Sequence, residues 1–390
     1  MTPRATDWGL ALLVAAGLAT GLGTWFAGSP GSAWVVDAHT VGGTALALLL
    51  VVKLRRVWPR VAPGARRPPG SGRGLAAVAL VLSVVLSGLV WSTAGHVGVA
   101  GFSVLVWHAA VGAVLAAAVV AHATLRARRL RADDVARRNF IVGALMAGGA
   151  LVAWRLQRPL QGLLGLPGAE RRFTGSYDAG SFTGNAFPAT SWVADRPRPA
   201  DAGARLHVAG RVRRPLERSA ADLDRGDELV ATLDCTGGFF STQRWRGVRL
   251  DRLLDEAGVA AGGRHVRVIS RTGYRWSFAL ADAPGLLLAT HVGEEPLTHG
   301  HGAPCRLVAP GRRGFQWVKW VERIEVHDDP DPGAVASTLW SSFTPAGRGD
   351  ALSAVHRPAP RRPRGAGDRS SSGLSAGAQV GRRRSIVHPP

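Results

Sequence analysis

The chain has 390 residues, a formal net charge of +21 and two cysteines. That length allows two or three domains, and two cysteines are too few for a secreted scaffold held together by disulfides. The charge would suit a nucleic-acid-binding protein, but the arginines gather in two loops between apolar segments and in the tail after His356, where topology or disorder explains them, so no nucleic-acid partner is expected.

Five apolar segments follow one another in the first part of the chain. Each approaches the length that crosses a hydrocarbon core at about 1.5 Å per residue. The segments are Trp8–Phe26, Ala33–Val52, Gly74–Trp91, Phe102–Leu125 and Phe140–Trp154. They predict an all-α membrane-spanning bundle in residues 1–157, surrounded by membrane lipid.

The charges of the connecting loops predict how the bundle is oriented. The loops Lys53–Arg73 and Arg126–Arg138 are rich in arginine, whereas Ala27–Ser32 and Ser92–Gly101 contain no Lys, Arg, Asp or Glu. Basic loops stay in the cytoplasm, so the two uncharged loops should face the far side of the membrane. The N-terminus is then cytoplasmic, and everything after about Gln157 is extracytoplasmic.

Two histidines lie at equal depth in the predicted bundle. His39 and His108 each stand about six residues from the outer end of their segments, roughly 9 Å below the surface by helical rise. Ionisable side chains inside a membrane are costly and mark functional sites. Two imidazoles on neighbouring helices suit the axial positions of one haem b, and hydrogen bonding within the bundle is the alternative.

A third histidine extends this pattern towards the inner surface. His122 follows His108 by fourteen residues, which returns it close to the same helix face. This spacing would suit a ligand of a second haem. However, Lys53 stands fourteen residues after His39, where the second partner would be expected. His122 also lies near the inner interface, so snorkelling towards the headgroups is its alternative role.

Short strands follow in the second half of the chain. Runs of β-branched or alternating apolar residues, bounded by Gly, Pro and Asp, predict them. The strands are expected at Leu206–Gly210, Leu229–Asp234, His265–Ile269, Arg306–Val308 and Ile324–Val326, with a helix at Leu250–Glu256. We therefore predict a mixed α+β, mainly β domain at residues 205–332, after a linker and N-terminal arm at 158–204. Residues 333–390 are expected to be a disordered tail.

Six short motifs follow one another within that domain. They are Leu206–Gly210 with Pro215–Leu216, Ala231–Cys235, Trp245–Leu250, Gly273–Tyr274, Gly302–Gly311 and Gly314–Val321. Their order is similar to that of the sulfite-oxidase superfamily, nearer to its bacterial methionine-sulfoxide-reductase branch. The resemblance covers about 160 residues, from near Arg172 to near Pro332. It implies an oxidoreductase that binds molybdopterin with molybdenum.

The resemblance also implies roles for single residues. Cys235 ends a strand and would bind molybdenum beside the two dithiolene sulfurs of the pterin, which suits a soft thiolate; an inert buried cysteine is the alternative. Cys305 stands at an aliphatic position of its motif and is expected in the core. Tyr274 would donate a hydrogen bond to a metal oxo group or to the substrate, or else be a half-buried sheet residue.

The phosphate of the pterin needs cationic and backbone donors. By motif position Arg306 and Lys319 are the main candidates, and their alternative role is that of solvated or salt-bridged residues at a strand end. His301 stands where the reductase branch has an asparagine before Gly-Ala-Pro, and it is retained as a contact. The remaining candidate contacts are Asn185, Ser270, Trp317 and Val318.

Together these features predict a membrane-anchored molybdenum enzyme that reduces a sulfoxide-like substrate by oxygen-atom transfer. Its electrons would come from haem b in the bundle, fed by the quinone pool or another membrane carrier. One alternative is sulfite dehydrogenation with reversed electron flow, for which several arginines are available: Arg244, Arg246, Arg271 and Arg275. The other is a non-catalytic membrane-anchored protein whose second domain binds a partner.

Arg137 and Arg138 precede a weakly apolar stretch rich in Gly and Ala and resemble a twin-arginine export signal inside the chain. A domain that receives its cofactor in the cytoplasm has to cross the membrane folded. This requirement favours the twin-arginine export machinery over the alternative that the two arginines are only the positively charged cytoplasmic flank of the span.

We expect a reporter fused after Leu166 to be exported, and the double change Arg137→Lys, Arg138→Lys to abolish export. Continued export of that variant, or export in cells without the machinery, would leave the arginines as a positive flank only.

Overall fold

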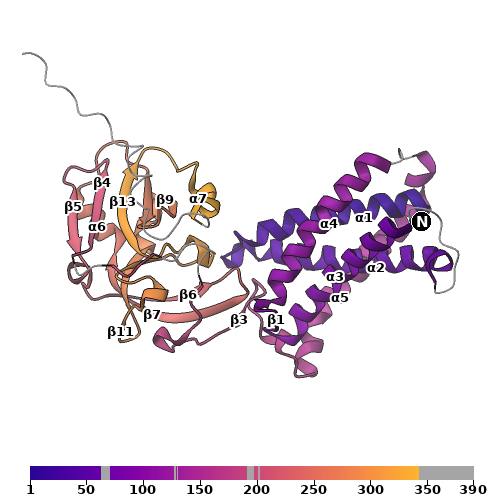
Figure 1. The fold of residues 1–390 in the computed structure, drawn as a ribbon, viewed down its shortest axis with the longest axis horizontal. Coiled ribbons are helices and arrows are strands. Elements are labelled where there is room, and N and C mark those ends of the chain that lie inside the picture. The colour runs from indigo at the N-terminus through magenta and orange to yellow at the C-terminus, as the bar shows by residue number, and fades with distance from the viewer. Residues whose placement is uncertain (63–70, 127–128, 130, 191–196, 201–202, 342–390) are drawn as a thin grey trace, which may run out of the picture. The chain divides into compact units, whose positions relative to one another are not determined.

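The computed structural model describes residues 1–62, 71–126, 129, 131–190, 197–200 and 203–341. These residues belong to one compact unit, in which a group of long helices comes first and two larger sheets follow (Figure 1). Most of the predicted tail, residues 342–390, lies outside the described residues. Residues 63–70, a part of the first arginine-rich loop, also lie outside the described residues.

Each predicted span is a helix. The helices are α1 (Pro3–Thr24), α2 (Ala33–Val61), α3 (Ser71–Ala94), α4 (Val104–Arg126) and α5 (Arg137–Leu163). Within the described residues all five are long and apolar enough to cross a membrane, which confirms this part of the prediction. α1 begins earlier than predicted, because Thr2 caps it by accepting the Ala5 N–H at 3.1 Å and Pro3 suits the first turn.

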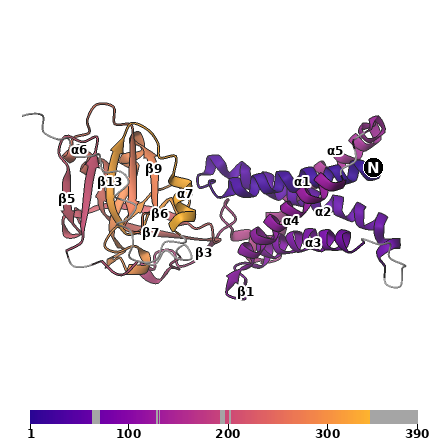
Figure 2. The same ribbon diagram turned by 45° about the horizontal axis from the view of Figure 1, so that its top comes forward.

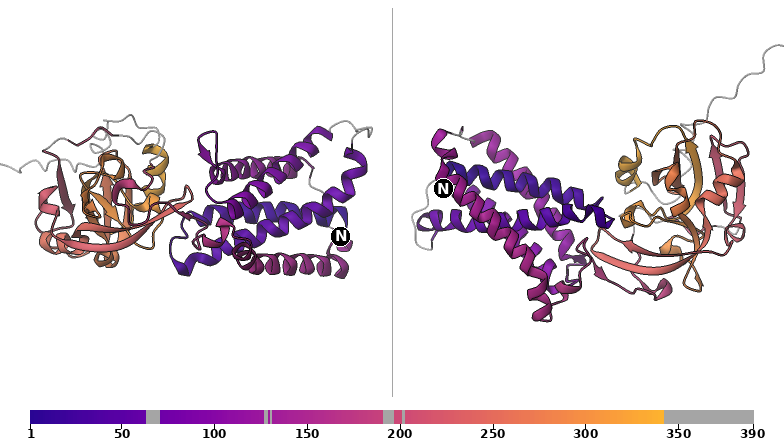
Figure 3. Two further views of the ribbon diagram at one scale, coloured as in Figure 1. Left: turned by 90° about the horizontal axis from the view of Figure 1, so that it is seen from below. Right: turned by 180° about the vertical axis from the view of Figure 1, so that it is seen from behind.

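The helices pack through a small apolar core, and Figure 3 shows them from two further sides. Val14 of α1, Leu46 and Leu50 of α2, Val81 of α3 and Leu115 of α4 are buried against one another. Many other large apolar side chains of the five helices are exposed, as they are on a bundle that faces lipid instead of water.

Two sheets form the second part of the described chain (Figure 2). One has the order β5 (Leu216–Ser219), β4 (Arg205–Gly210), β13 (Val321–His327), β8 (His265–Ser270) and β9 (Arg275–Ala279), with β4 and β13 parallel. The other is built around β7 (Phe239–Arg249), which pairs with β6 (Asp227–Asp234), β10 (Leu287–Val292) and the short β3 (Tyr177–Asp178). β10 also pairs with β11 (Glu295–Pro296) and β12 (Arg306–Val308).

The strands that the sequence predicts are present as β4, β6, β8, β12 and β13, and the predicted helix is α6 (Leu250–Ala257). The mixed, mainly β class is therefore confirmed. The prediction missed β7, the longest strand, because polar residues occupy two of its inward positions. Ser241 and Gln243 are buried there and bonded to each other, with 2.7 Å between the amide nitrogen and the hydroxyl oxygen.

One apolar core joins both sheets. Leu288 of β10 and Val208 of β4 are among its fully buried members. α6 adds a single buried face whose residues recur at helical spacing, namely Leu250, Leu253, Leu254 and Ala257. The helix ends where Gly258 takes a φ of +66°, a conformation that favours glycine.

A short helix, α7 (Ala334–Ser341), lies inside the segment that the sequence predicts to be disordered. Ala334 is buried in the core, and Ser337 Oγ donates to Arg275 O at 3.1 Å. The prediction of disorder from residue 333 onward was wrong for this stretch. The average composition of residues 333–390 hid a mostly apolar run at their start.

Candidate functional site

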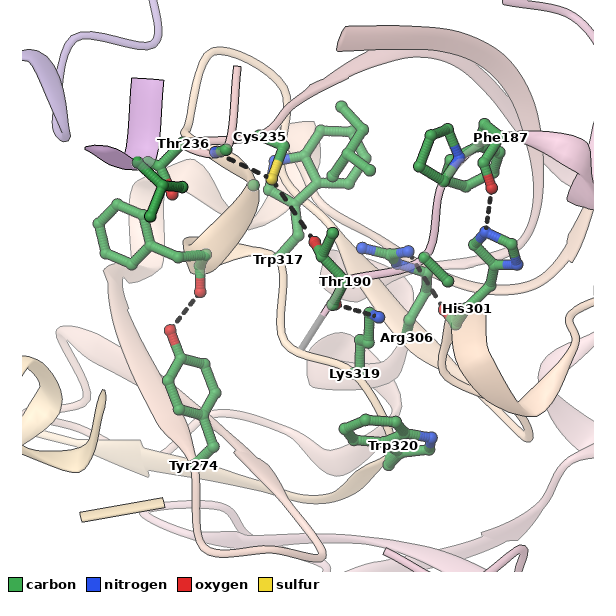
Figure 4. Close-up of a pocket in the computed structure, with 17 residues that line it drawn as sticks. Phe187, Thr190, Cys235, Thr236, Tyr274, His301, Arg306, Trp317, Lys319 and Trp320 are labelled. Carbon is green, nitrogen blue, oxygen red and sulfur yellow. Dashed lines mark hydrogen bonds between the residues drawn. The ribbon is translucent and has the colours of Figure 1, made fainter. Parts of the chain in front are cut away.

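Side chains from several separate segments meet at a cavity of about 300 Å³ (Figure 4). Cys235 lies in the turn between β6 and β7, His301 in a 3-10 turn, and Arg306 at the start of β12. Trp317 and Lys319 come from the segment just before β13. Strand ends and the short turns beside them therefore hold these five side chains around one space, which gives the site a rigid frame.

The turn at Cys235 presents its sulfur to this cavity. Cys235 N donates to Phe239 O at 2.8 Å, and Gly238 N donates to Cys235 O at 3.0 Å. Gly237 N lies 3.3 Å from the sulfur, and Thr190 Oγ1 lies 3.5 Å from it. The thiol is half-buried and held from two sides, an arrangement that suits a ligand aimed at a bound metal.

Asp234 stands directly before Cys235 and is almost completely buried, with 1% of its surface exposed. Its carboxylate accepts from Thr174 Oγ1 at 2.6 Å and from Ser176 Oγ at 2.8 Å. Both hydroxyls belong to the segment that follows the bundle. The network therefore ties that segment to the end of β6.

Two arginines balance this carboxylate. Arg172 Nε lies 3.2 Å from one oxygen of Asp234, and Arg313 Nη1 donates to the other at 2.7 Å. Arg313 Nη2 also donates to Cys235 O at 3.2 Å, so one guanidinium holds the carboxylate and the cysteine backbone together. Burial lowers the pKa of Arg313, while the charge of Asp234 acts in the opposite direction.

Arg306 is the second fully buried cation of the site. Its guanidinium lies over the rings of Trp245 and Trp317, at 5.2 and 5.7 Å from their centroids, and Nη1 donates to His301 O at 3.1 Å. Burial lowers the pKa of Arg306 to about 9, and its Nε has no hydrogen-bond partner within the described part of the chain. No carboxylate in those residues balances this charge. An anionic group such as a phosphate would do so.

His301 lines the cavity as a neutral ring. Burial, followed by the charge of Arg306, lowers the pKa of His301 to about 4. Because the Phe187 carbonyl can only accept, the 3.0 Å contact places the proton on Nε2, and Nδ1 accepts from Thr298 Oγ1 at 2.8 Å. The ring also packs on Phe187, with 4.1 Å between the centroids.

Lys319 and Tyr274 complete the polar lining of the cavity. Lys319 Nζ donates to Thr190 O and Gly300 O, both at 2.6 Å, and lies 5.4 Å from the centroid of the Trp320 ring. The Tyr274 hydroxyl donates to the carbonyl oxygen of Phe315. Its proton is therefore directed at the protein backbone, as Figure 4 shows.

Three of the predicted pterin contacts lie away from the lining of this cavity. Asn185 donates to Glu295 and to Pro296 O, and Ser270 Oγ accepts from Thr272 Oγ1 at 3.1 Å. The carbonyl of Val318 accepts from the N–H of Leu307 at 2.7 Å. Within the described residues the structure gives these groups roles in holding loops and strands.

Cys305 and the four arginines considered for an oxyanion also lie outside the cavity lining. Cys305 is 1% exposed and sits in the core as predicted, and burial raises the pKa of its thiol to about 12. Three of the arginines pair with acids: Arg244 with Glu294, Arg246 with Asp224 and Arg275 with Asp331. The fourth, Arg271, donates to a backbone carbonyl at 3.2 Å.

The bundle holds a second arrangement of interest, the pair His39 and His108. Their ring centroids are 5.9 Å apart and their planes are nearly perpendicular, at 88°. Imidazoles on opposite sides of one metal ion have centroids roughly 6 Å apart, given metal–nitrogen bonds of about 2 Å. The spacing of the two rings therefore fits a shared metal.

Hydrogen bonds assign the ring nitrogens of this pair. His108 Nδ1 lies 3.0 Å from Val84 O, which can only accept, so Nδ1 carries the proton. His39 Nδ1 lies 3.0 Å from Thr20 Oγ1, whose own proton goes to Ala16 O at 2.7 Å. Both rings therefore offer an unprotonated Nε2, and a bond at Nδ1 is what orients a metal-binding histidine.

A glycine lies against each of these rings. A Cβ built on Gly21 of α1 would lie 3.2 Å from His39 Cε1, and one built on Gly88 of α3 would lie 3.1 Å from His108 Cε1. Larger residues would crowd both imidazoles.

The third histidine does not form a comparable pair within the described residues. His122 is exposed on α4, and Lys53, at the position expected for its partner, forms an ion pair with Asp7. A second haem site thus gains no support from this geometry.

Residues 195–335 match a family model described as oxidoreductase molybdopterin binding domain. The NAD(P)H nitrate reductase of Hordeum vulgare is 31% identical over 31% of this chain and 18% of its own length. The mitochondrial sulfite oxidase of Macaca fascicularis is 30% identical over 36% of this chain and 32% of its own length. The protein-methionine-sulfoxide reductase catalytic subunit MsrP of Gluconobacter oxydans is 28% identical over 42% of this chain and 56% of its own length. The chain thus spans less than two thirds of each relative. Residues 195–335 form a molybdopterin-binding oxidoreductase domain of the sulfite-oxidase superfamily, which confirms the predicted enzyme class.

The sequence analysis missed the residues that fix the cysteine turn. The sequence motifs include Asp234 without assigning it a role, and they do not single out Arg313, Thr174 or Thr190. An acid directly before the proposed metal ligand was the one available clue, because a carboxylate at the inner end of a strand needs partners.

The first structural prediction concerns Asp234. Asp234→Asn keeps the size of the side chain but leaves Arg313 buried without its counter-charge, a change that typically costs about 3–5 kcal/mol. We expect a loss of that order in the free energy of unfolding, measured by chemical denaturation of the detergent-purified chain. The control is Asp224→Asn, in a more exposed pair with Arg246, for which at most about 1 kcal/mol is expected. Equal, small losses in both variants would contradict the role of the network.

Proposed function

We propose that this chain is a membrane-anchored molybdenum enzyme that reduces a sulfoxide-like substrate by oxygen-atom transfer at the cavity of Cys235. The observation that carries the proposal is that a half-buried thiol shares one cavity with Arg306, a buried cation without a carboxylate partner in the described residues. A soft sulfur ligand and an anion-binding cation are what a molybdopterin requires of its protein.

Residues of this chain would hold the cofactor at both of its ends. Cys235 would bind the metal, and Arg306 would bind the phosphate, with Lys319 nearby to add a second positive charge. When bound, the cofactor supplies oxygen-atom transfer with a two-electron change at the metal. Trp245 and Trp317 cover Arg306 and keep water from it, which strengthens its attraction for an anion. His301 stays neutral and adds no charge to this balance.

The remaining cavity wall favours an uncharged substrate. It is formed largely by apolar side chains, namely Val106, Phe187, Leu233, Phe315 and Trp320. The four arginines considered for sulfite lie elsewhere, and a doubly charged oxyanion is costly to bury without several cations. Reduction of a sulfoxide to a sulfide and water consumes two electrons and two protons. Sulfite dehydrogenation, suggested by the similarity to sulfite oxidase, is the second candidate.

The histidine pair supports a membrane source for these electrons. His39 and His108 would bind one haem b through Nε2, between α2 and α4. A membrane quinol is the proposed donor, because it supplies two electrons and two protons for each sulfoxide. Lipid around the five helices would bring the quinol to the bundle.

Contacts between the bundle and the sheets support an extracytoplasmic catalytic domain. The ring of Phe26, next to one uncharged connection, lies 5.6 Å from that of Phe315. Ser103, next to the other uncharged connection, donates to Gly237 O at 3.4 Å. The end of the bundle that the charge pattern places outside is thus the end that contacts the catalytic domain.

The proposed metal ligand can be tested against the other cysteine. We expect Cys235→Ala to abolish sulfoxide reduction with an artificial electron donor and to remove one sulfur from the molybdenum X-ray absorption spectrum. Cys305→Ala should behave almost like the wild type in both measurements and lose only about 1 kcal/mol of stability. Wild-type protein without molybdenum would instead favour the non-catalytic partner-binding role, and full turnover by Cys235→Ala would exclude this thiol as the metal ligand.

The haem proposal predicts a shared spectrum for two substitutions. His39→Ala and His108→Ala should each remove the same low-spin haem b signal from reduced-minus-oxidised spectra of membranes, because either change leaves one axial position open. His122→Ala is the matched control on the same helix as His108 and should leave that signal intact. A full signal in either of the first two variants would exclude that residue as a ligand.

A further inference from the structure

Trp91, close to the end of α3, is fixed by polar contacts on two sides. It is 5% exposed, and its indole N–H donates to Gly175 O at 3.1 Å. Its own carbonyl accepts from Tyr177 Oη at 2.5 Å, and the two rings are 5.3 Å apart. Trp91 therefore lies within the junction of bundle and sheets and is not a lipid-facing anchor.

One edge of this indole lies against the turn of Cys235. A Cβ built on Gly238 would lie 2.3 Å from Cζ2 of Trp91, so the glycine and the indole are in direct contact. Gly238 takes a φ of +98°, and its N–H donates to Cys235 O at 3.0 Å. The residue beneath the indole is therefore part of the turn that carries the proposed metal ligand.

The same helix contacts His108, one of the two histidines, one turn earlier. Gly88 precedes Trp91 by three residues, about 4.5 Å along the helix axis, and residues at this spacing are neighbours on the helix surface. A Cβ built on Gly88 would lie 3.1 Å from His108 Cε1. A single turn of α3 thus contacts both the proposed haem ligand and the proposed molybdenum turn.

We propose that Trp91 is the packed bridge through which electrons pass from the haem of His39 and His108 to the molybdenum at Cys235. This inference rests on the proposed function. Two electrons cross one at a time for each sulfoxide, which also takes up two protons and leaves as sulfide and water. Oxidation of the quinol to quinone supplies the two electrons and releases two protons. Transfer between buried centres slows steeply when packed atoms between them are replaced by a gap.

The test separates transfer through the bridge from chemistry in the cavity. In purified full-length protein, stopped-flow absorbance follows oxidation of the reduced haem by dimethyl sulfoxide, and steady-state turnover is measured with a reduced viologen dye that reaches the cavity directly. Trp91→Ala should slow haem oxidation by about tenfold or more while retaining dye-driven turnover. Trp91→Phe, which keeps a ring in place, should recover most of the rate.

Trp107 on α4 provides a matched control. It is 41% exposed, and its indole N–H donates at 3.0 Å to the carbonyl of Val99, which lies in the short strand β1 (Gly98–Val99) before α4. Trp107→Ala should oxidise its haem at the wild-type rate. Hydrogen exchange at the Gly238 amide gives a second measurement: it should be faster in Trp91→Ala and unchanged in Trp107→Ala.

Each other outcome contradicts a defined part of the inference. Unchanged haem oxidation in Trp91→Ala would exclude the bridge. A parallel loss of dye-driven turnover would assign the slower haem oxidation to damage in the cavity, which also overturns the proposal. A wild type without a haem spectrum, or with a haem that dimethyl sulfoxide does not oxidise, would instead contradict the proposed function itself.

Discussion

The buried carboxylate of Asp234 is the contact on which the catalytic half of the molecule depends. It joins three parts of the chain that are far apart in sequence: the segment that leaves the bundle, the end of β6 and the loop before β13. A buried ion pair is favourable only when its remaining lone pairs and protons are also satisfied. Here two hydroxyls and Arg313 donate hydrogen bonds to the carboxylate and Arg172 adds a second positive charge, so the position of the neighbouring Cys235 follows from electrostatics as much as from the hairpin.

The sequence was sufficient where a property belongs to one segment alone. Hydropathy predicts all five helices, and equal depth in the bundle predicts that His39 and His108 lie close together, as their rings do. It was insufficient where a side chain depends on distant neighbours. Asn185 and Ser270 occupy plausible motif positions, but their side chains bond to nearby loop residues, because a motif fixes a place in sequence and leaves the side-chain direction open. From the sequence, Trp91 is predicted only to be the last residue of the third span.

The polar groups beside His39 and His108 form hydrogen bonds with the Nδ1 atoms of these rings. A hydroxyl or a carbonyl at this nitrogen keeps the proton on Nδ1, so Nε2 carries no proton and its lone pair can bind a metal. The iron of the proposed haem would bind both of these lone pairs at once. Gly21 and Gly88 fit the same explanation, since each leaves room beside an imidazole where a side chain would crowd it.

Arg306 connects cofactor binding to the route of export. Arg306 is fully buried and has no acidic partner among the described residues, so it loses several kcal/mol of hydration, whereas its contacts with Trp245 and Trp317 return only about 1–2 kcal/mol each. The charge of Arg306 therefore destabilises the folded domain until an anion binds this arginine. A ligand that binds only the folded state stabilises that state. Loading the cofactor before the domain crosses the membrane would make the folded state the exported one. The burial of this one side chain is thus compatible with the export route that Arg137 and Arg138 predict from the sequence.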